Sequence, residues 1–130
     1  MRGAFAAALT RREPLRIAAD GHPWPETGYL AVAAGTTPDI GFGFRAFQRC
    51  RERPGCFHAI GLTGSLFRVA LSMPRLRRGA PWRADIARDA VVRELVLDGD
   101  GVRFTLDGHL YAAVREVRVE TGPSVELVLP

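Results

Sequence analysis

The sequence has 130 residues, 47% of them hydrophobic and 25% charged, which is the composition of one globular domain and excludes a mainly disordered chain. No apolar run reaches about 18 residues, so the sequence predicts no transmembrane helix. The formal net charge is +4, and all of the basic residues are Arg. The codon bias of a GC-rich genome is the simple explanation of this arginine usage, but a positive field still favours anionic partners such as phosphates or lipid headgroups.

The first half of the chain predicts one short helix and three strands. A helix over about 3–11 explains the apolar start better than a signal peptide, because Arg11 and Arg12 stand where a cleavage site should lie. Strands are predicted at 14–19, 29–34 and 57–62. A loop is expected over about 35–53, and it holds the run Gly41-Phe42-Gly43-Phe44.

The second half predicts a helix and then a series of strands. Helical spacing begins at Ser65, and Pro74 should kink or restart that helix. The apolar residues at helical intervals are Leu66, Val69, Ala70 and Met73. Strands follow at 102–106, 114–119 and 125–129, linked by Gly-containing turns such as Asp98-Gly99-Asp100-Gly101. The sequence therefore predicts a single domain over 1–130, a mainly β antiparallel sandwich with one or two peripheral helices.

Two cysteines and one histidine lie close together in the sequence. Cys50 and Cys56 are too few for a disulfide framework, so we expect reduced thiols in a cytoplasmic protein. Cys50, Cys56 and His58 could be zinc ligands, but the spacing of the cysteines is too wide and a fourth ligand is missing. A small buried thiol beside a histidine at the edge of the core is the better interpretation.

A basic segment over 68–83 carries arginines, apolar residues and a tryptophan, with no acidic residue among them. Such an amphipathic, arginine-rich stretch is typical of attachment to an anionic membrane surface. A solvated helix face over a sandwich explains the same pattern, and this alternative stays open. No recognised nucleic-acid-binding motif accompanies the charge, so we expect no nucleic-acid partner. The candidate membrane- or substrate-binding residues are Arg68, Arg75, Arg77, Arg78 and Trp82.

The C-terminal third contains motifs in an order that is found in a known family. A strand ends in Asp107-Gly108-His109, a variable stretch follows, and two strands at 114–119 and 125–130 close on a final Pro. This order resembles the C-terminal lobe of the diacylglycerol-kinase-like lipid kinases, the superfamily that includes bacterial lipid kinases and sphingosine kinases.

Upstream segments extend the resemblance over nearly the whole chain. The segments 15–20 and 29–35 are similar to the paired strands before the glycine-containing loop of that family, and 41–45 with 53–58 resemble a variant of the loop and its next strand. The resemblance implies that the loop glycines Gly35, Gly41 and Gly43 lie near the cleft of such a kinase.

Two departures from the family pattern matter for function. The family's nucleotide-binding motif, Gly-Gly-Asp-Gly-Thr, occurs nowhere in these 130 residues, and His109 stands where the family has a Glu. The resemblance therefore implies the lipid-side lobe only: a fragment, a split subunit or a degenerate relative. ATP and Mg²⁺ are implied by the family and would be bound mainly by the missing lobe, on another chain or upstream in the intact gene product.

The chemistry implied by the resemblance is transfer of the γ-phosphoryl group of ATP to a lipid hydroxyl. His109 would act as a base beside Asp107, although Asp107 can equally be only a turn former before Gly108. The alternative is a non-enzymatic β-sandwich that binds an anionic membrane surface or a protein partner. Either protein would be cytoplasmic, with the option of peripheral attachment to the membrane.

Overall fold

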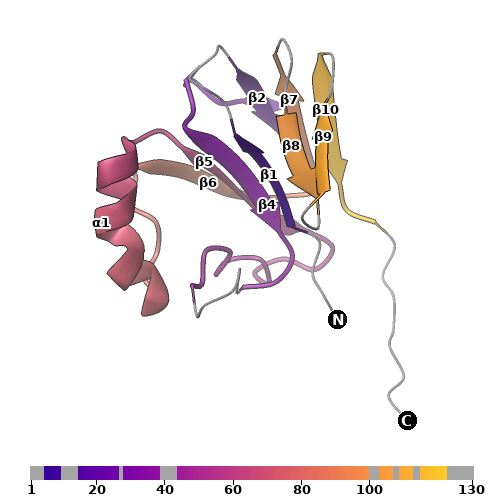
Figure 1. Cartoon of the computed structure of the whole chain (residues 1–130). Coiled ribbons are helices and arrows are strands. Elements are labelled where there is room, and N and C mark those ends of the chain that lie inside the picture. Colours follow the sequence, from indigo (N-terminus) through magenta and orange to yellow (C-terminus); the bar gives the residue numbers. More distant parts are fainter. Residues whose placement is uncertain are drawn as a thin grey trace.

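The strands and the helix are arranged in two packed sheets with one helix at the side (Figure 1). The computed structural model describes residues 5–9, 15–26, 28–38, 44–99, 103–106, 109–112 and 115–122. In chain order the elements are β1 (Phe5–Leu9), β2 (Arg16–Ala19), β3 (His22–Pro23), β4 (Ala31–Gly35), β5 (Phe57–Leu62), α1 (Leu66–Arg77), β6 (Ala87–Val92), β7 (Glu94–Asp98), β8 (Arg103–Leu106), β9 (His109–Ala112) and β10 (Glu116–Glu120).

All strand pairs are antiparallel within the part of the chain that the structure describes. A six-stranded sheet, here called sheet A, has the order β6-β5-β4-β1-β8-β9. A four-stranded sheet, sheet B, has the order β10-β7-β2-β3. The predicted antiparallel sandwich is therefore confirmed, and α1 lies beside the β5 and β6 end of sheet A (Figure 1).

The helix predicted over 3–11 is wrong. Residues Phe5–Leu9 form β1, which lies in the interior of sheet A between β4 and β8. The run of alanines has a high intrinsic helix propensity, but each residue of a helix gains only tenths of a kcal/mol from that preference. Pairing on both sides gives β1 two ladders of backbone hydrogen bonds, and this tertiary context decides the conformation.

The main core fills the space between the two sheets. Sheet B contributes alternate residues of β2 and β7, and sheet A contributes alternate residues of β4 and β5. The largest fully buried side chains of this cluster are those of Leu15, Ile17, Tyr29 and Leu95. The alternation follows from the two-residue period of a strand, which sends neighbouring side chains to opposite faces.

A second, smaller core covers the outer face of sheet A. Ile60 of β5 and Ala87 of β6 pack there against Phe47 and Cys50 of the loop before β5 and against Ile86. Both cysteines are free and buried, as the expected reduced thiols should be. Cys56 precedes β5, while His58 is fully buried within that strand instead of lying at the edge of the core.

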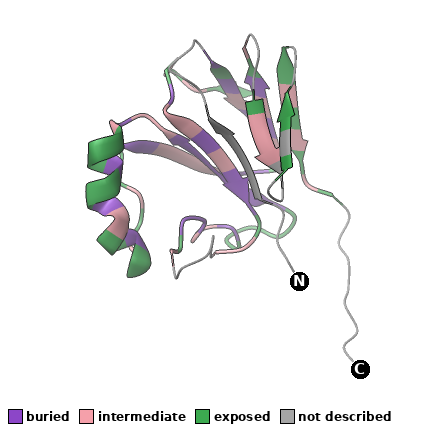
Figure 2. Cartoon of the chain, viewed as in Figure 1, coloured by how far each residue is buried: buried purple, intermediate pink, exposed green. Residues whose placement is uncertain are grey.

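Helix α1 begins after Ser65, whose side chain accepts a hydrogen bond from the backbone N–H of Arg68. The helix continues through Pro74, where the sequence predicted a kink or a restart. Its buried residues are Val69, Ser72 and Leu76. Leu66, which the helical spacing grouped with Val69, is 70% exposed, so the buried face of α1 differs from the predicted one (Figure 2).

Two differences concern the C-terminal strands. The structure adds the short edge strand β9, which the sequence treated as part of a variable stretch. The strand predicted at 114–119 is found as β10, shifted by one or two residues. The strand predicted at 125–129 lies outside the described residues.

Candidate functional site

His109 is the first residue of the edge strand β9, and it is exposed. The strand registers place it in one transverse row with Leu106 of β8, Ala6 of β1 and Ala34 of β4. Neighbouring strands lie about 4.8 Å apart, so three strand spacings separate His109 from Ala34 by about 14 Å. His109 and Gly35 therefore reach the same end of sheet A without touching each other.

Gly35, the last residue of β4, is buried under an aromatic ring. A Cβ atom at this position would lie 2.3 Å from Cδ2 of Phe47, a distance that real side chains do not reach. The absence of a side chain at Gly35 lets the loop of residues 44–56 lie flat against the end of β4. The other predicted loop glycines, Gly41 and Gly43, lie outside the described residues, as does Asp107.

A polar network joins the same loop to sheet A. His58 pairs in register with Gly35 across β4 and β5, and its ring is fully buried. Its Nε2 lies 2.7 Å from Oδ2 of Asp89 on β6, and its Nδ1 is 3.4 Å from the backbone N of Arg49. The guanidinium of Arg49 donates to the same carboxylate oxygen at 2.9 Å and to Glu52 at 3.0 Å.

The hydrogen bonds of this network determine where the ring proton of His58 lies and keep the carboxyl of Asp89 ionised. The backbone N–H of Arg49 donates to Nδ1 of His58, so the ring carries its proton on Nε2 and donates it to Asp89. Burial alone raises the pKa of Asp89, but the hydrogen bonds from His58 and Arg49 outweigh burial and hold this pKa below its ordinary value. Asp89 is therefore an ionised acceptor that fixes the position of the loop.

The predicted arginines of 68–83 occupy different surroundings. Arg77 lies over the ring of Phe44, with 5.3 Å between its guanidinium carbon and the ring centroid. Arg78 caps the C-terminus of α1 through its backbone, and its side chain is exposed. Arg68 pairs with Asp85, whereas no carboxylate in the described part of the chain pairs with Arg75.

Trp82 has a structural position as well as a predicted binding role. Its indole N–H donates to the backbone carbonyl of Ala46 at 2.9 Å, and its ring packs against the second core. Half-buried in this way, Trp82 ties the segment after α1 to the loop before β5. Its contact with a membrane stays a prediction.

The structure also reveals apolar residues that the sequence did not assign to a site. Leu66, Phe67 and Leu71 of α1 are 70%, 71% and 64% exposed. Phe67 and Leu71 are four residues apart, so they lie one above the other on the helix surface. This spacing is visible in the sequence, but it could equally have marked a buried face.

The candidate residues thus lie in three regions of the molecule. The arginines and the exposed apolar residues gather on α1, beside the β6 edge of sheet A, whereas His109 lies on β9 at the opposite edge. Gly35, Phe47 and the network around Asp89 form the third region, over the outer face of β4, β5 and β6.

Comparison with solved structures identifies the fold. A diacylglycerol kinase from Bacillus anthracis str. Sterne matches with a TM-score of 0.62 and 8% sequence identity, over 90% of this chain and 46% of that one. The chain has the fold of a diacylglycerol kinase lobe. Two further structures assigned to the diacylglycerol kinases of the same organism match with TM-scores of 0.64 and 0.62, at 10% and 8% identity.

The chain spans about half the length of these diacylglycerol kinases. The second and third structures are covered over 39% and 50% of their lengths, by 84% and 90% of this chain. This agrees with the predicted resemblance to one lobe of the lipid kinases. No family model matches the sequence, and no curated protein matches it.

Proposed function

We propose that this chain is the lipid-side lobe of a diacylglycerol-kinase-like enzyme that transfers the γ-phosphoryl group of ATP to a lipid hydroxyl. The observation that carries the proposal is the match of nearly the whole chain to about half of each of three diacylglycerol kinase structures. A second lobe, on another chain or elsewhere in the gene product, would supply the nucleotide-binding motif that these 130 residues lack.

ATP and Mg²⁺ belong to that second lobe in this proposal. Among the described residues no three His, Cys, Asp or Glu side chains come close enough to hold a metal ion. Asp89 is occupied by His58 and Arg49, and Asp85 by two arginines, which leaves these carboxylates poorly suited to a metal. The residues described here do not form a magnesium site on their own.

His109 is the residue of this lobe that we place beside the reacting hydroxyl. It is exposed on the edge strand β9, where a second lobe can approach it. A neutral imidazole can accept the proton that the lipid hydroxyl loses when its oxygen attacks the phosphorus. Asp107 would support this imidazole.

The test is reconstitution with a nucleotide-binding lobe, sought in the genomic sequence beside this one. The chain alone should transfer no phosphate from ATP to diacylglycerol vesicles, and the pair of lobes should do so. In the pair, His109→Ala should lower turnover by about 10²-fold or more, as removal of a general base does, and His109→Glu should maintain or raise it.

His22 provides the matched control, because it is a second exposed histidine and lies on β3 of sheet B, whereas His109 lies on β9 of sheet A. His22→Ala should leave turnover unchanged. Unchanged turnover in His109→Ala would remove the assigned role, and an inactive pair of lobes that both fold and associate would contradict the kinase proposal.

A second candidate function has an observation of its own. The exposed Leu66, Phe67 and Leu71, flanked by arginines, favour peripheral attachment of α1 to an anionic membrane surface, with or without enzymatic activity. No described helix is long and apolar enough to cross a bilayer. We place the protein in the cytoplasm, at the surface of the membrane.

A further inference from the structure

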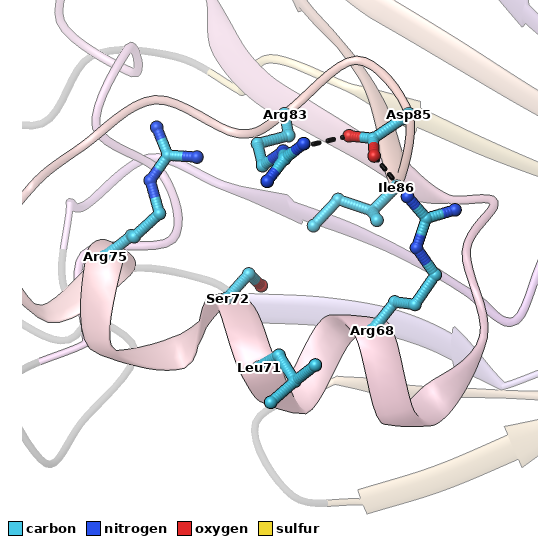
Figure 3. A pocket seen from close by; sticks show the side chains of 7 residues that line it. All are labelled: Arg68, Leu71, Ser72, Arg75, Arg83, Asp85 and Ile86. Carbon is cyan, nitrogen blue, oxygen red and sulfur yellow. Dashed lines mark hydrogen bonds and ion pairs between the residues drawn. The ribbon is translucent and has the colours of Figure 1, made fainter.

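A pocket of about 120 Å³ lies between α1 and the segment that leads into β6 (Figure 3). Its wall consists of three arginines, one carboxylate, one hydroxyl and two aliphatic residues: Arg68, Arg75, Arg83, Asp85, Ser72, Leu71 and Ile86. A cavity needs only about 10–15 Å³ of such space to hold one water molecule, so the pocket admits several waters or a group of the size of phosphate.

The charges around the pocket do not cancel. Arg83 donates to Asp85 at 3.2 Å, and Arg68 pairs with the other oxygen of the same carboxylate. Arg75 comes from the opposite end of the helix, and among the described residues no carboxylate pairs with it (Figure 3). Three guanidinium groups and one carboxylate give the pocket a net charge of +2.

The donors of the pocket suit a phosphate oxygen. Guanidinium groups bind phosphate through charge-assisted hydrogen bonds and in pairs of parallel donors. Asp85 holds Arg68 and Arg83 at the rim, while more than half of each arginine side chain stays exposed to a ligand, at 52% and 58%. Ser72 and Ile86 form a buried floor that excludes water from beneath the ligand.

Leu71 connects the pocket to the apolar face of α1. Leu71 lines the pocket and is also one of the three large apolar side chains exposed on the helix. A phosphate held by Arg75 and Arg83 would therefore have an apolar surface directly beside it. In a lipid, this surface would face the acyl chains that adjoin the headgroup phosphate.

From this geometry we infer that the pocket is a binding site for a phosphate group, in which Arg75 and Arg83 are the principal donors. The phosphate can belong to a lipid headgroup or to a soluble phosphate compound. The lipid source rests on the proposed function, since it needs the chain to work at a membrane. The soluble source does not depend on it.

Two probes distinguish the sources. Inorganic phosphate is titrated into the full chain and followed by NMR at the Nε–H groups of Arg75 and Arg83. In parallel, the chain is sedimented with phosphatidylcholine vesicles that contain or lack phosphatidic acid. Neither measurement needs ATP, a second lobe or turnover, so failure of the kinase proposal would leave the result interpretable.

The variants are Arg75→Gln and Arg83→Gln, with Arg51→Gln as the matched control. Arg51 is exposed and lies outside the pocket, and its substitution changes the net charge by the same amount. Loss of a hydrogen bond to a charged group weakens binding by about tenfold, so each pocket variant should bind that much more weakly. The control should change binding by less than about twofold, because Arg51 does not line the pocket and its exposed charge is screened by salt.

The outcomes separate clearly. Tenfold loss with phosphatidic acid vesicles assigns the site to lipid headgroups, and a loss with inorganic phosphate alone assigns it to soluble phosphates. If both pocket variants bind both probes as the control does, the site is overturned. Each altered side chain is exposed, so the melting temperature of each variant should match that of the wild type. An unchanged melting temperature shows that a variant is folded and that its loss of binding has another cause.

Discussion

At the scale of single residues, the segment before β5 is held by contacts that reach across the sheet. His58 and Asp89 are 31 residues apart in sequence, but Nε2 of His58 lies 2.7 Å from Oδ2 of Asp89. Arg49 joins them from the loop, so that one carboxylate accepts two donors. A buried polar group that keeps all its partners stabilises one arrangement, while the loss of one partner leaves the others unsatisfied.

Asp89→Asn tests this network through its pH dependence. The pKa of Asp89 is lower in the folded state than in the unfolded state, where it is about 3.9. The ionised carboxylate therefore stabilises the fold at pH values above about 3.9, and this stabilisation is lost as the pH falls through the folded-state pKa. We expect Asp89→Asn to lower the free energy of unfolding by about 1–3 kcal/mol near neutral pH. The difference from the wild type should shrink as the solution is acidified.

Urea unfolding at several pH values measures both effects. Asp98→Asn is the control, because Asp98 is exposed and should change stability little at any pH. A destabilisation by Asp89→Asn that is equal at neutral and at acidic pH would show that the network does not depend on the charge of this carboxylate.

Gly35→Ala tests the second contact of the loop. The added Cβ would lie 2.3 Å from the ring of Phe47, so either the ring or the strand must move. Overpacking of this kind costs about 1–3 kcal/mol of unfolding free energy. Gly28→Ala is the control, because nothing lies within 4 Å of a Cβ atom there. Equal melting temperatures of the two variants would mean that the loop moves away from Gly35→Ala without a loss of stability.

At the scale of elements, α1 presents two different faces. The buried face of Val69, Ser72 and Leu76 holds the helix against the molecule, and the opposite face exposes Phe67 and Leu71. An exposed phenylalanine contributes little to folding, because it stays in water in the folded state as well. We therefore expect Phe67 to act in binding a partner outside this chain.

Phe67→Gln should therefore separate binding from stability. We expect the free energy of unfolding to change by less than about 0.5 kcal/mol, as is usual for exposed positions. Binding to vesicles that contain phosphatidic acid should weaken by about tenfold, since burial of such a side chain is worth at least about 1.5 kcal/mol.

Tyr111→Gln is the control for this experiment. Tyr111 is another exposed aromatic residue, at 46%, but it lies on β9 and stacks on Phe104. Vesicle sedimentation should show no change for this variant. Similar losses for both variants would place the membrane contact on the whole surface instead of on α1.

At the scale of the whole molecule, the charge is unevenly divided along the chain. Residues 1–83 contain 13 Arg and 5 acidic residues, a net +8, and residues 84–130 contain 5 Arg and 9 acidic residues, a net −4. Arg75 of α1 pairs with no carboxylate among the described residues and lines the pocket, whereas β10 carries ion pairs such as those of Arg118 with Glu94 and Glu116.

Salt should therefore weaken attachment to anionic vesicles. The Debye length falls from about 10 Å at 0.1 M to about 3 Å at 1 M ionic strength, which screens the arginines that lie at the surface. Sedimentation with phosphatidic acid vesicles should decrease steadily over this range, and neutral phosphatidylcholine vesicles should bind weakly throughout. Equal binding to both kinds of vesicle at every ionic strength would rule out an electrostatic attachment.

The sequence by itself determined the class of the fold. Glycine-containing turns and closely spaced strands predict an antiparallel sandwich because turn chemistry and the two-residue period of a strand are local properties. The prediction for 57–62 coincides with β5. The order of the motifs in the C-terminal third also led to the lipid kinase fold that the solved structures share.

Only the tertiary structure decided which faces are buried and which residues meet. The alanine-rich start fits a helix or a strand locally, and it became β1 because two neighbouring strands pair with it. The same apolar spacing on α1 could have faced inward, but the packing of Val69 and Leu76 turned Phe67 to the solvent. His58, Asp89 and the phosphate pocket depend on contacts between distant segments, which no local pattern of residues encodes.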